Sequence, residues 1–411
     1  MKPPHLFAYF GVELEYMIVD QTTLAVRPWA DRVLIDATGK PISDIERGRL
    51  TWSNELVGHV IELKTTLPEE NLDGLAEQFA SEVDEVNRRL AAHGVQIMPT
   101  AMHPLMKPEE AVLWTHDFSE VYAAFDRIFD CRGHGWSNLQ SVHLNLPFAN
   151  DAEFARLHAA IRLVLPLLPA LAASSPLVEG ESTGHVDNRL AFYRVNSAKL
   201  PTLCGNVIPE PVYSKTDYEK EIFDPIAVQL APHDPEGVLE ARFSNSRGAI
   251  ARFDRDSIEI RLLDIQECPA ADLAVLRTII ALLRELVSEI RVPLAEQKIV
   301  PVKPLKALFD ATVDQGGEAM VTEPTVLRAF GSNGASASAA ELWRGVIERL
   351  RPVESASVAE QKALAVICSH GNLSTRILRA RAQGESIDNI YRRLAAGVGS
   401  NTMFMPPGQI D

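Results

Sequence analysis

The sequence has few cysteines and no long run of positive charge. Its four cysteines show no CxxC spacing and lie at Cys131, Cys204, Cys268 and Cys368. This pattern favours reduced, mostly buried thiols over a disulfide framework or a zinc site. No run of lysine and arginine exceeds two residues, and the formal net charge is −15. Because phosphate backbones and anionic lipids attract basic surfaces, we expect neither a nucleic-acid partner nor a membrane-surface partner.

Long apolar runs are also missing. The longest uncharged apolar stretch, residues 163–178, is interrupted by Pro166, Pro169 and Pro176, so it is too short and too broken to span a bilayer. The chain opens without a charged segment followed by an apolar one. We therefore expect no export signal and a cytoplasmic protein.

The common nucleotide-binding motifs are absent as well. The sequence has no GxxxxGKS or GxxxxGKT loop, no GxGxxG after a predicted strand, and no HRD and DFG pair. A site for nucleotide in this chain would therefore be neither a P-loop nor a protein-kinase site.

What is present is the composition of a globular protein. The chain has 411 residues, of which 46% are hydrophobic and 23% charged, so it can bury a large core as one elaborate domain or two modest ones. Alternation of apolar and polar residues predicts strands over residues 7–20, 56–66, 95–99, 139–147 and 257–264. Helical spacing predicts helices over residues 71–93, 151–165, 270–291, 339–350, 357–368 and 387–395. The fold class is therefore α+β, with an antiparallel or mixed sheet.

Four of the predicted strands carry polar side chains on one face. Residues two apart on a strand share a face, which groups Glu13 with Glu15, Glu62 with Lys64, His143 with Asn145, and Glu259 with Arg261. Glu55 lies seven residues before Glu62, so it needs a turn or bulge, which Gly58 could provide, to reach the same face.

Two carboxylates on one strand face repel each other. At an effective dielectric near 20, like charges about 4 Å apart repel by roughly 4 kcal/mol, so such a pair tends to hold a proton, a basic partner or a divalent metal. For any one strand, a solvated polar face or a cross-strand ion pair explains the pattern equally well. Together, five carboxylates and one imidazole form an oxygen-rich set that suits magnesium or manganese better than zinc.

Arginines precede the last of these strands. Arg242, Arg247, Arg252 and Arg255 lie in a segment immediately upstream of Glu259 and Arg261. Planar guanidinium groups suit phosphate oxygens, although a solvated loop with local ion pairs is the alternative. Carboxylates that hold Mg²⁺ beside arginines that hold phosphate are the parts of a phosphoryl-transfer site that uses a nucleoside triphosphate.

The order of these motifs resembles the glutamine synthetase superfamily, and most closely glutamate-cysteine ligase family 2, the bacterial carboxylate-amine ligases. The resemblance rests on GVELEYMIVD, Glu55 through IELKTT, Met102-His103-Pro104, ALAASSPLVEG with Arg189, IEIRLLD and GNLSTRIL. It implies a curved, mostly antiparallel sheet with helices on its convex face. It also implies a glutamine synthetase-like catalytic domain over residues 1–310 and a helical C-terminal extension over residues 311–411, packed on that domain.

The resemblance also implies roles for single residues. It suggests that Glu15, Glu55 and Glu62 hold one divalent ion, Mg²⁺ or Mn²⁺. It suggests that Glu13, His143 and Glu259 hold a second ion that bridges the phosphates of ATP. Arg247 and Arg252 match phosphate-contacting arginines, Arg261 matches the arginine beside the transferred phosphoryl group, and Arg189 matches a substrate-side arginine. Asn145 stands where glutamine synthetases carry a second histidine, and it remains able to hydrogen-bond phosphate or substrate.

The implied activity is ATP-dependent formation of a γ-glutamyl amide through an acyl phosphate. The substrates would be a glutamate-like acid and an amine such as cysteine, as in glutathione biosynthesis. Two other functions stay open: a guanidino-kinase-type phosphotransferase, and a non-catalytic regulator that binds nucleotide and metal. The protein is expected to act as a monomer or a homo-oligomer.

Overall fold

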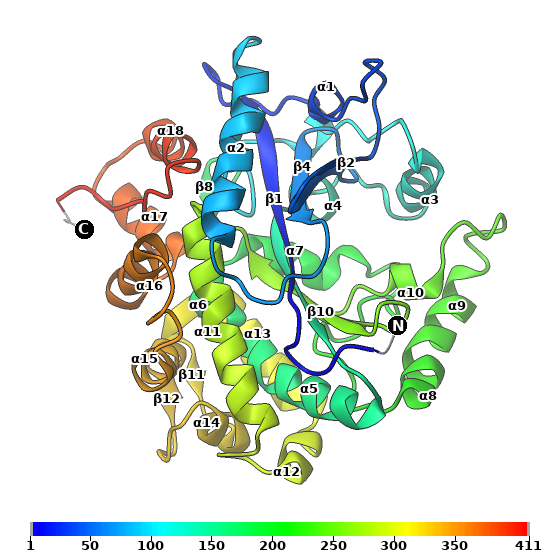
Figure 1. Cartoon of the computed structure of the whole chain (residues 1–411), viewed down its shortest axis with the longest axis vertical. Helices are drawn as coiled ribbons and strands as arrows, with labels where there is room; N and C mark the ends of the chain where they lie inside the picture. Colours follow the sequence, from blue (N-terminus) through cyan, green and yellow to red (C-terminus); the bar gives the residue numbers. More distant parts are fainter. Residues whose placement is uncertain (1–2, 409–411) are drawn as a thin grey trace.

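An eight-stranded sheet is the centre of the molecule (Figure 1). The computed structural model describes residues 3–408. The strand order is β2-β3-β4-β1-β6-β10-β9, with β5 paired to β1, and every pairing is antiparallel. The strands are β1 Gly11–Asp20, β2 Asp44–Arg47, β3 Leu50–Asn54, β4 Val60–Thr65, β5 Val95–Met98, β6 Ser141–Pro147, β9 Ala249–Arg252 and β10 Ser257–Asp264. The sheet is open, and the predicted α+β class is confirmed.

Eighteen α-helices surround this sheet within the described residues. Those before residue 269 are α1 Ala30–Val33, α2 Leu75–Ala91, α3 Ser119–Phe129, α4 His134–Ser137, α5 Asp151–Val164, α6 Leu168–Ala172, α7 Asn188–Asn196, α8 Lys215–Tyr218, α9 Asp224–Leu230 and α10 Ala241–Ser244. The later ones are α11 Pro269–Val287, α12 Leu294–Lys298, α13 Val302–Gln315, α14 Pro324–Ala329, α15 Ala339–Leu350, α16 Val358–His370, α17 Leu373–Ala382 and α18 Ile387–Gly397. Two further antiparallel pairs of short strands are β7 Leu177–Val178 with β8 Glu181–Ser182, and β11 Met320–Val321 with β12 Ala337–Ser338.

Helices α2 and α11 lie side by side on one face of the sheet (Figure 1). The alternate residues of β1 that point to this face, Val12, Leu14 and Tyr16, are fully buried in the same core as Phe79 of α2. Helix α2 presents its apolar residues at three- and four-residue spacing, which is why it packs there. Gly94, just past its end, has φ +69°, a left-handed conformation that glycine adopts readily and that commonly ends helices.

The opposite face of β1 changes character along the strand. Glu13 and Glu15 occupy its first half, whereas Met17 and Val19 in its second half are buried in a separate apolar cluster with Ile377 of α17 and other residues of α17 and α18. The C-terminal helices therefore cover one end of the sheet face that carries the glutamates. The predicted helical C-terminal part is confirmed, and Figure 1 shows it along one side of the molecule.

The division into residues 1–310 and 311–411 remains a prediction. Its boundary falls inside α13, which runs without a break from Val302 to Gln315. A boundary drawn after Gln315 would leave this helix whole.

The apolar stretch around α5 is a core element. Asp151–Ala172 is long and apolar enough to cross a membrane by length and composition alone, but 89% of its apolar window is buried inside the protein. A core helix of a soluble globular protein has this property.

Candidate functional site

The polar residues of four neighbouring strands, β4, β1, β6 and β10, meet on one face of the sheet. Glu15 on β1 lies opposite Glu62 on β4, and Glu13 lies opposite Lys64 on one side and His143 on the other. Glu259 on β10 lies opposite Asn145 on β6. The intervening apolar residues point into the core, so the alternation seen in the sequence is what places these side chains together.

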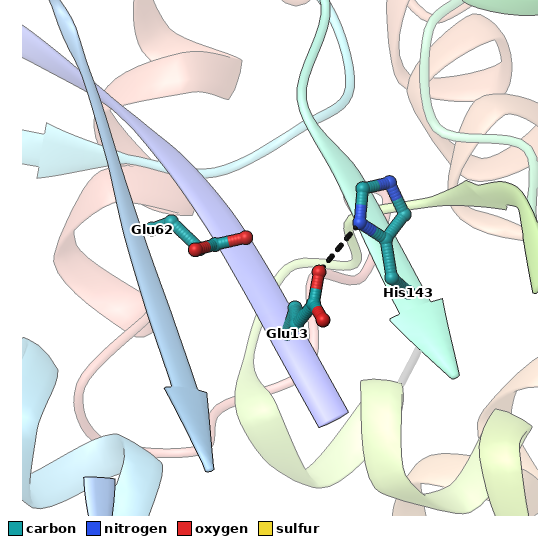
Figure 2. Close-up of side chains that lie close together, drawn as sticks. All are labelled: Glu13, Glu62 and His143. Atoms are coloured by element: carbon teal, nitrogen blue, oxygen red, sulfur yellow. Dashed lines mark hydrogen bonds and ion pairs between the residues drawn. The ribbon is translucent and has the colours of Figure 1, made fainter. Parts of the chain in front are cut away.

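Glu13, Glu62 and His143 form a first group of possible ligands. One ligand atom from each residue lies within 4.8 Å of the others. Figure 2 shows the three side chains converging from β1, β4 and β6, with His143 Nδ1 hydrogen-bonded to Glu13 Oε2 at 2.8 Å. Asn145 Nδ2 donates to the other Glu13 oxygen at 3.0 Å. Asn145 therefore orients the Glu13 carboxylate.

Glu15, Glu55 and Glu62 form a second group by the same criterion. Glu15 accepts a hydrogen bond from the backbone N–H of Ser141 at 2.7 Å, which holds its carboxylate against β6. Glu55 directly follows the last residue of β3 and belongs to the turn between β3 and β4. This turn brings Glu55 to the site from the strand next to β4. Glu62 belongs to both groups and thus stands at the centre of the site.

Glu259 belongs to neither group among residues 3–408. Its carboxylate faces Arg252 Nη1 at 3.5 Å and Arg261 Nε at 3.5 Å. The structure thus unites the three residues expected to share one ion, and it joins Glu13 with His143 as expected, but Glu62 completes the second set in place of Glu259. Glu259 lies two strands away from Glu13, beside the arginines.

Burial and repulsion set the charges in this site. Burial, together with the charge of Glu15, raises the pKa of Glu55 to about 7. Burial, together with the charge of Glu13, raises the pKa of Glu62 well above its ordinary value. Burial also opposes ionisation of Glu13, but the hydrogen bond and charge of His143 outweigh it and lower the pKa of Glu13 to about 2. Burial lowers the pKa of His143, but the hydrogen bond to Glu13 and the charges of Glu15 and Glu13 outweigh it and raise this pKa to about 9.

These shifts describe a site in which carboxylates outnumber cations. Glu13 and His143 form an ion pair, whereas burial and the neighbouring carboxylates make ionisation of Glu55 and Glu62 costly. A divalent cation would supply the missing charge. Carboxylate oxygens with one imidazole nitrogen are a donor set that fits Mg²⁺ or Mn²⁺.

The arginines upstream of Glu259 have different surroundings. Arg247 is buried and makes a two-point ion pair with Glu210, at 2.5 and 2.8 Å. Arg252, on β9, is bonded to Asp254 and faces Glu259. Arg261 has 27% of its side chain exposed, and its pKa is raised because the Tyr193 hydroxyl and the charges of Glu259, Glu15 and Glu13 outweigh the effect of burial. Of the three, Arg261 presents its guanidinium most openly beside the carboxylates.

Arg189 lies in the interior. Only 2% of its side chain is exposed, its Nε donates to Asp264 Oδ1 at 2.5 Å, and both terminal nitrogens contact the carbonyl oxygen of Arg261. Asp264 also accepts from the backbone N–H of Ser174 and from the Ser175 hydroxyl. The charge of Arg189 is therefore used to hold β10 against α7, and its role toward a substrate carboxylate stays a prediction.

Replacing Arg189 with methionine tests these two roles. We expect a loss of about 3–5 kcal/mol in the free energy of unfolding, because Asp264 would be left buried without its partner. Urea denaturation of the variant measures this loss. Arg194→Met is the matched control on α7, since Arg194 makes half-exposed pairs worth about 1 kcal/mol or less. If the Arg189→Met variant instead has wild-type stability and a raised KM for the expected glutamate-like acid, then Arg189 binds the substrate carboxylate.

His103, from the Met102-His103-Pro104 segment, is a structural residue. Its Nε2 donates to the carbonyl of Leu24 at 2.7 Å, and its Nδ1 accepts from the backbone N–H groups of Leu105 and Met106 at 3.1 and 2.9 Å. Only the neutral ring can make all three bonds. Burial accordingly lowers the pKa of His103 to about 4.

His103 should make the fold sensitive to acid. In the unfolded chain the ring titrates near pH 6.5, so between pH 6.5 and 4 the unfolded state binds more protons and stability falls as pH falls. The expected loss from this residue is about 3 kcal/mol across that window. Urea denaturation at a series of pH values measures it. His103→Gln should flatten the profile, whereas a change at exposed His93 should not, and parallel profiles for all three proteins would contradict the assignment.

The contacts of some site residues could not be predicted from the sequence. Parity placed Lys64 on the polar face, but nothing indicated its contacts. Lys64 Nζ lies 3.0 Å from Glu62 and 3.3 Å from Asp44, and Asp44 comes from the β2–β3 hairpin that the patterns did not predict. Glu210, the partner of Arg247, lies 37 residues away in the sequence. The spacing of neighbouring residues cannot predict an ion pair over such a separation.

Comparison with known proteins identifies the family of this chain. Residues 9–393 match the family model of glutamate-cysteine ligase family 2. A protein of Archaeoglobus fulgidus named "Uncharacterized protein" is 37% identical over 289 residues, which are 70% of this chain and 78% of that one. A protein of Corynebacterium glutamicum named "Putative glutamate-cysteine ligase 2" is 25% identical over 259 residues, which are 62% of this chain and 61% of that one.

A solved structure shows the same fold. Glutamate-cysteine ligase from Francisella tularensis, in complex with AMP, superposes with a TM-score of 0.57 at 12% sequence identity, and the match covers 99% of this chain and 91% of that one. The family match spans nearly the whole chain and includes all four strands of the site. The chain is a carboxylate-amine ligase, and it belongs to glutamate-cysteine ligase family 2.

Proposed function

We propose that this protein uses ATP and Mg²⁺ or Mn²⁺ to join a glutamate-like acid to an amine such as cysteine. The product would be a γ-glutamyl or related amide. The observation that carries the proposal is the pair of overlapping carboxylate groups that share Glu62. Two adjoining cation sites beside arginines are the arrangement that phosphoryl transfer from a nucleoside triphosphate requires.

Formation of an amide from a carboxylate and an amine is unfavourable in water. The proposed reaction therefore begins with transfer of the γ-phosphoryl group of ATP to the carboxylate, which gives an acyl phosphate whose phosphate is a good leaving group. The amine then attacks the acyl carbon, and the amide, ADP and phosphate are released. When bound, the divalent cations supply positive charge that offsets the charge on the transferred phosphoryl oxygens.

The chain's own residues have distinct parts in this proposal. Glu15, Glu55 and Glu62 would hold one cation, and Glu13, His143 and Glu62 the other, with Glu259 adjoining it beside Arg252 and Arg261. Arg261 would hold a phosphoryl oxygen, because its guanidinium lies beside Glu259 and is partly exposed. Asn145 would keep the Glu13 carboxylate in position.

Other evidence supports the nucleotide and the setting. The Francisella ligase was solved with AMP, an adenine nucleotide, and the relatives' names specify glutamate and cysteine. We propose the cytoplasm as the location, since ATP and reduced thiols are available there. A place in glutathione biosynthesis would follow if cysteine is the amine.

The experiment is an incubation of the protein with ATP, Mg²⁺, and pools of acids and amines, with phosphate release and amide formation measured together. The proposal expects both, in equal amounts, only when acid and amine are present. A stable phosphorylated product without amide would point to a phosphotransferase. Nucleotide binding without any turnover would point to a regulatory protein. Either result would overturn the ligase assignment.

A further inference from the structure

Lys64 stands between the candidate metal site and the outer edge of the sheet. Its Nζ lies 3.0 Å from Glu62 Oε2 and 3.3 Å from Asp44 Oδ1. Its side chain is 32% exposed, whereas that of Glu62 is 7% exposed and that of Asp44 53%. The ammonium thus has an inner carboxylate partner that belongs to the metal site and an outer one that faces solvent.

Glu62, the inner partner of Lys64, would bind the metal ion once a cation enters the site. Glu62 contributes to both candidate cation groups, so its charge would be taken up by the metal. A metal beside the ammonium would also repel it, because both carry positive charge. Lys64 would then keep only the exposed Asp44, and its ammonium would be free to bind another anion.

Three nearby arginines already form ion pairs with carboxylates outside the candidate cation groups. Arg189 is paired with the buried carboxylate of Asp264, and Arg247 with both oxygens of Glu210. Arg252 is held by Asp254. Arg261 faces Glu259, which belongs to neither candidate cation group. Unlike these arginines, Lys64 has a carboxylate partner, Glu62, that belongs to the candidate cation groups found within residues 3–408.

The position of Lys64 separates it from the arginines. In the strand order β2-β3-β4-β1-β6-β10-β9, Lys64 lies on β4, toward the β2 edge, and Arg252 and Arg261 lie on β9 and β10, at the other edge. The glutamates of β1 lie between them. If the phosphates of ATP lie beside Arg252 and Arg261, then the acid substrate has to bind on the side of the sheet where Lys64 lies.

We infer that Lys64 binds a carboxylate of the acid substrate, and that without metal its ammonium neutralises Glu62 in place of the cation. This inference rests on the proposed ligase function. It restricts the substrate class, because the carboxylate that reacts cannot be the one that Lys64 holds. The acid should carry at least two carboxylates, and monocarboxylic acids should be poor substrates.

The test compares Lys64→Met, Lys64→Arg and the wild type, with Lys40→Met as an exposed-lysine control. Lys64→Met should bind Mn²⁺ about tenfold more tightly than the wild type in the absence of nucleotide and acid, measured by electron paramagnetic resonance, because the competing ammonium is gone. The same variant should show a KM for glutamate raised tenfold or more, with the KM for ATP unchanged. Lys64→Arg should restore most of the affinity for glutamate, and Lys40→Met should match the wild type.

The outcomes separate this inference from the proposed function. Amide formation by Lys64→Met with an unchanged KM for glutamate would overturn the inference and leave the ligase function standing. Unchanged Mn²⁺ affinity would overturn the competition between Lys64 and metal. If the wild type forms no amide from any acid, the ligase function fails and the substrate role of Lys64 fails with it. Thermal unfolding of each variant checks that the fold is kept.

Discussion

Glu62→Gln is expected to abolish turnover, with a loss of about a thousandfold or more. Glu62 is the one residue common to both candidate cation groups, so its replacement removes a ligand from each. Glutamine fills the same volume, but its amide is a neutral and weaker ligand than a carboxylate. Because cations offset charge that develops on the phosphoryl group, losing ligands from both sites lowers the rate rather than the affinity alone.

The same variant should keep its fold. Glu62 is buried beside Glu13, and its pKa is raised despite the ammonium of Lys64, so a neutral side chain at this position relieves a repulsion that a bound metal ion would offset. We therefore expect the melting temperature without metal to be unchanged or slightly higher, and the rise in melting temperature on adding Mg²⁺ to disappear. Differential scanning calorimetry with and without Mg²⁺ measures both quantities.

Glu46→Gln is the matched control, because Glu46 is an exposed glutamate on β2 of the same sheet. This variant should retain wild-type turnover and the full response to Mg²⁺. Wild-type turnover in Glu62→Gln would contradict the shared-ligand arrangement. An unfolded Glu62→Gln protein would instead assign the residue a structural role through Lys64.

Arg376→Met is expected to lower the free energy of unfolding by about 3–5 kcal/mol. Arg376, on α17, is 0% exposed and pairs with Glu267, which is 1% exposed and lies between β10 and α11. Its guanidinium also donates to the carbonyls of Phe404 and Gly371. Methionine leaves the Glu267 carboxylate buried without a partner, and it removes the polar contacts that join α17 to Glu267 and Phe404.

Urea denaturation measures the loss in the free energy of unfolding, and two further variants identify its cause. The double variant Arg376→Met with Glu267→Gln should recover part of the stability, because no unpaired charge remains buried. Arg381→Met, on the exposed side of the same helix, should stay within about 0.5 kcal/mol of the wild type. A loss below about 1 kcal/mol for Arg376→Met would mean that α17 is held by apolar contacts alone.

The pattern of alternating residues predicted the site strands well. Residues 139–147 and 257–264 were predicted as strands, and β6 and β10 span Ser141–Pro147 and Ser257–Asp264. Helices α2, α11, α15 and α18 lie within a few residues of their predicted bounds. These elements are long, and each has one apolar face, so the period of the pattern is unambiguous.

Shorter elements were missed for a physical reason. Strands β2 and β3 form a hairpin of four and five residues, and β9 has four residues inside the arginine-rich segment that reads as a loop. A window of four or five residues gives the pattern little to distinguish a strand from a turn, although β5, which is equally short, was predicted. The hairpin matters for function, because β3 delivers Glu55 to the site and β2 supplies the Asp44 partner of Lys64.

By itself, the sequence determined which side chains share a strand face, the α+β class and the resemblance to a ligase family, since these follow from local period and motif order. The tertiary structure alone decided the partners. It placed Glu62 rather than Glu259 beside Glu13 and His143, and it paired Arg189 with Asp264 and Arg247 with Glu210. The reason is that strand order and long-range ion pairs depend on residues far apart in the chain, whereas periodicity reports only on neighbours.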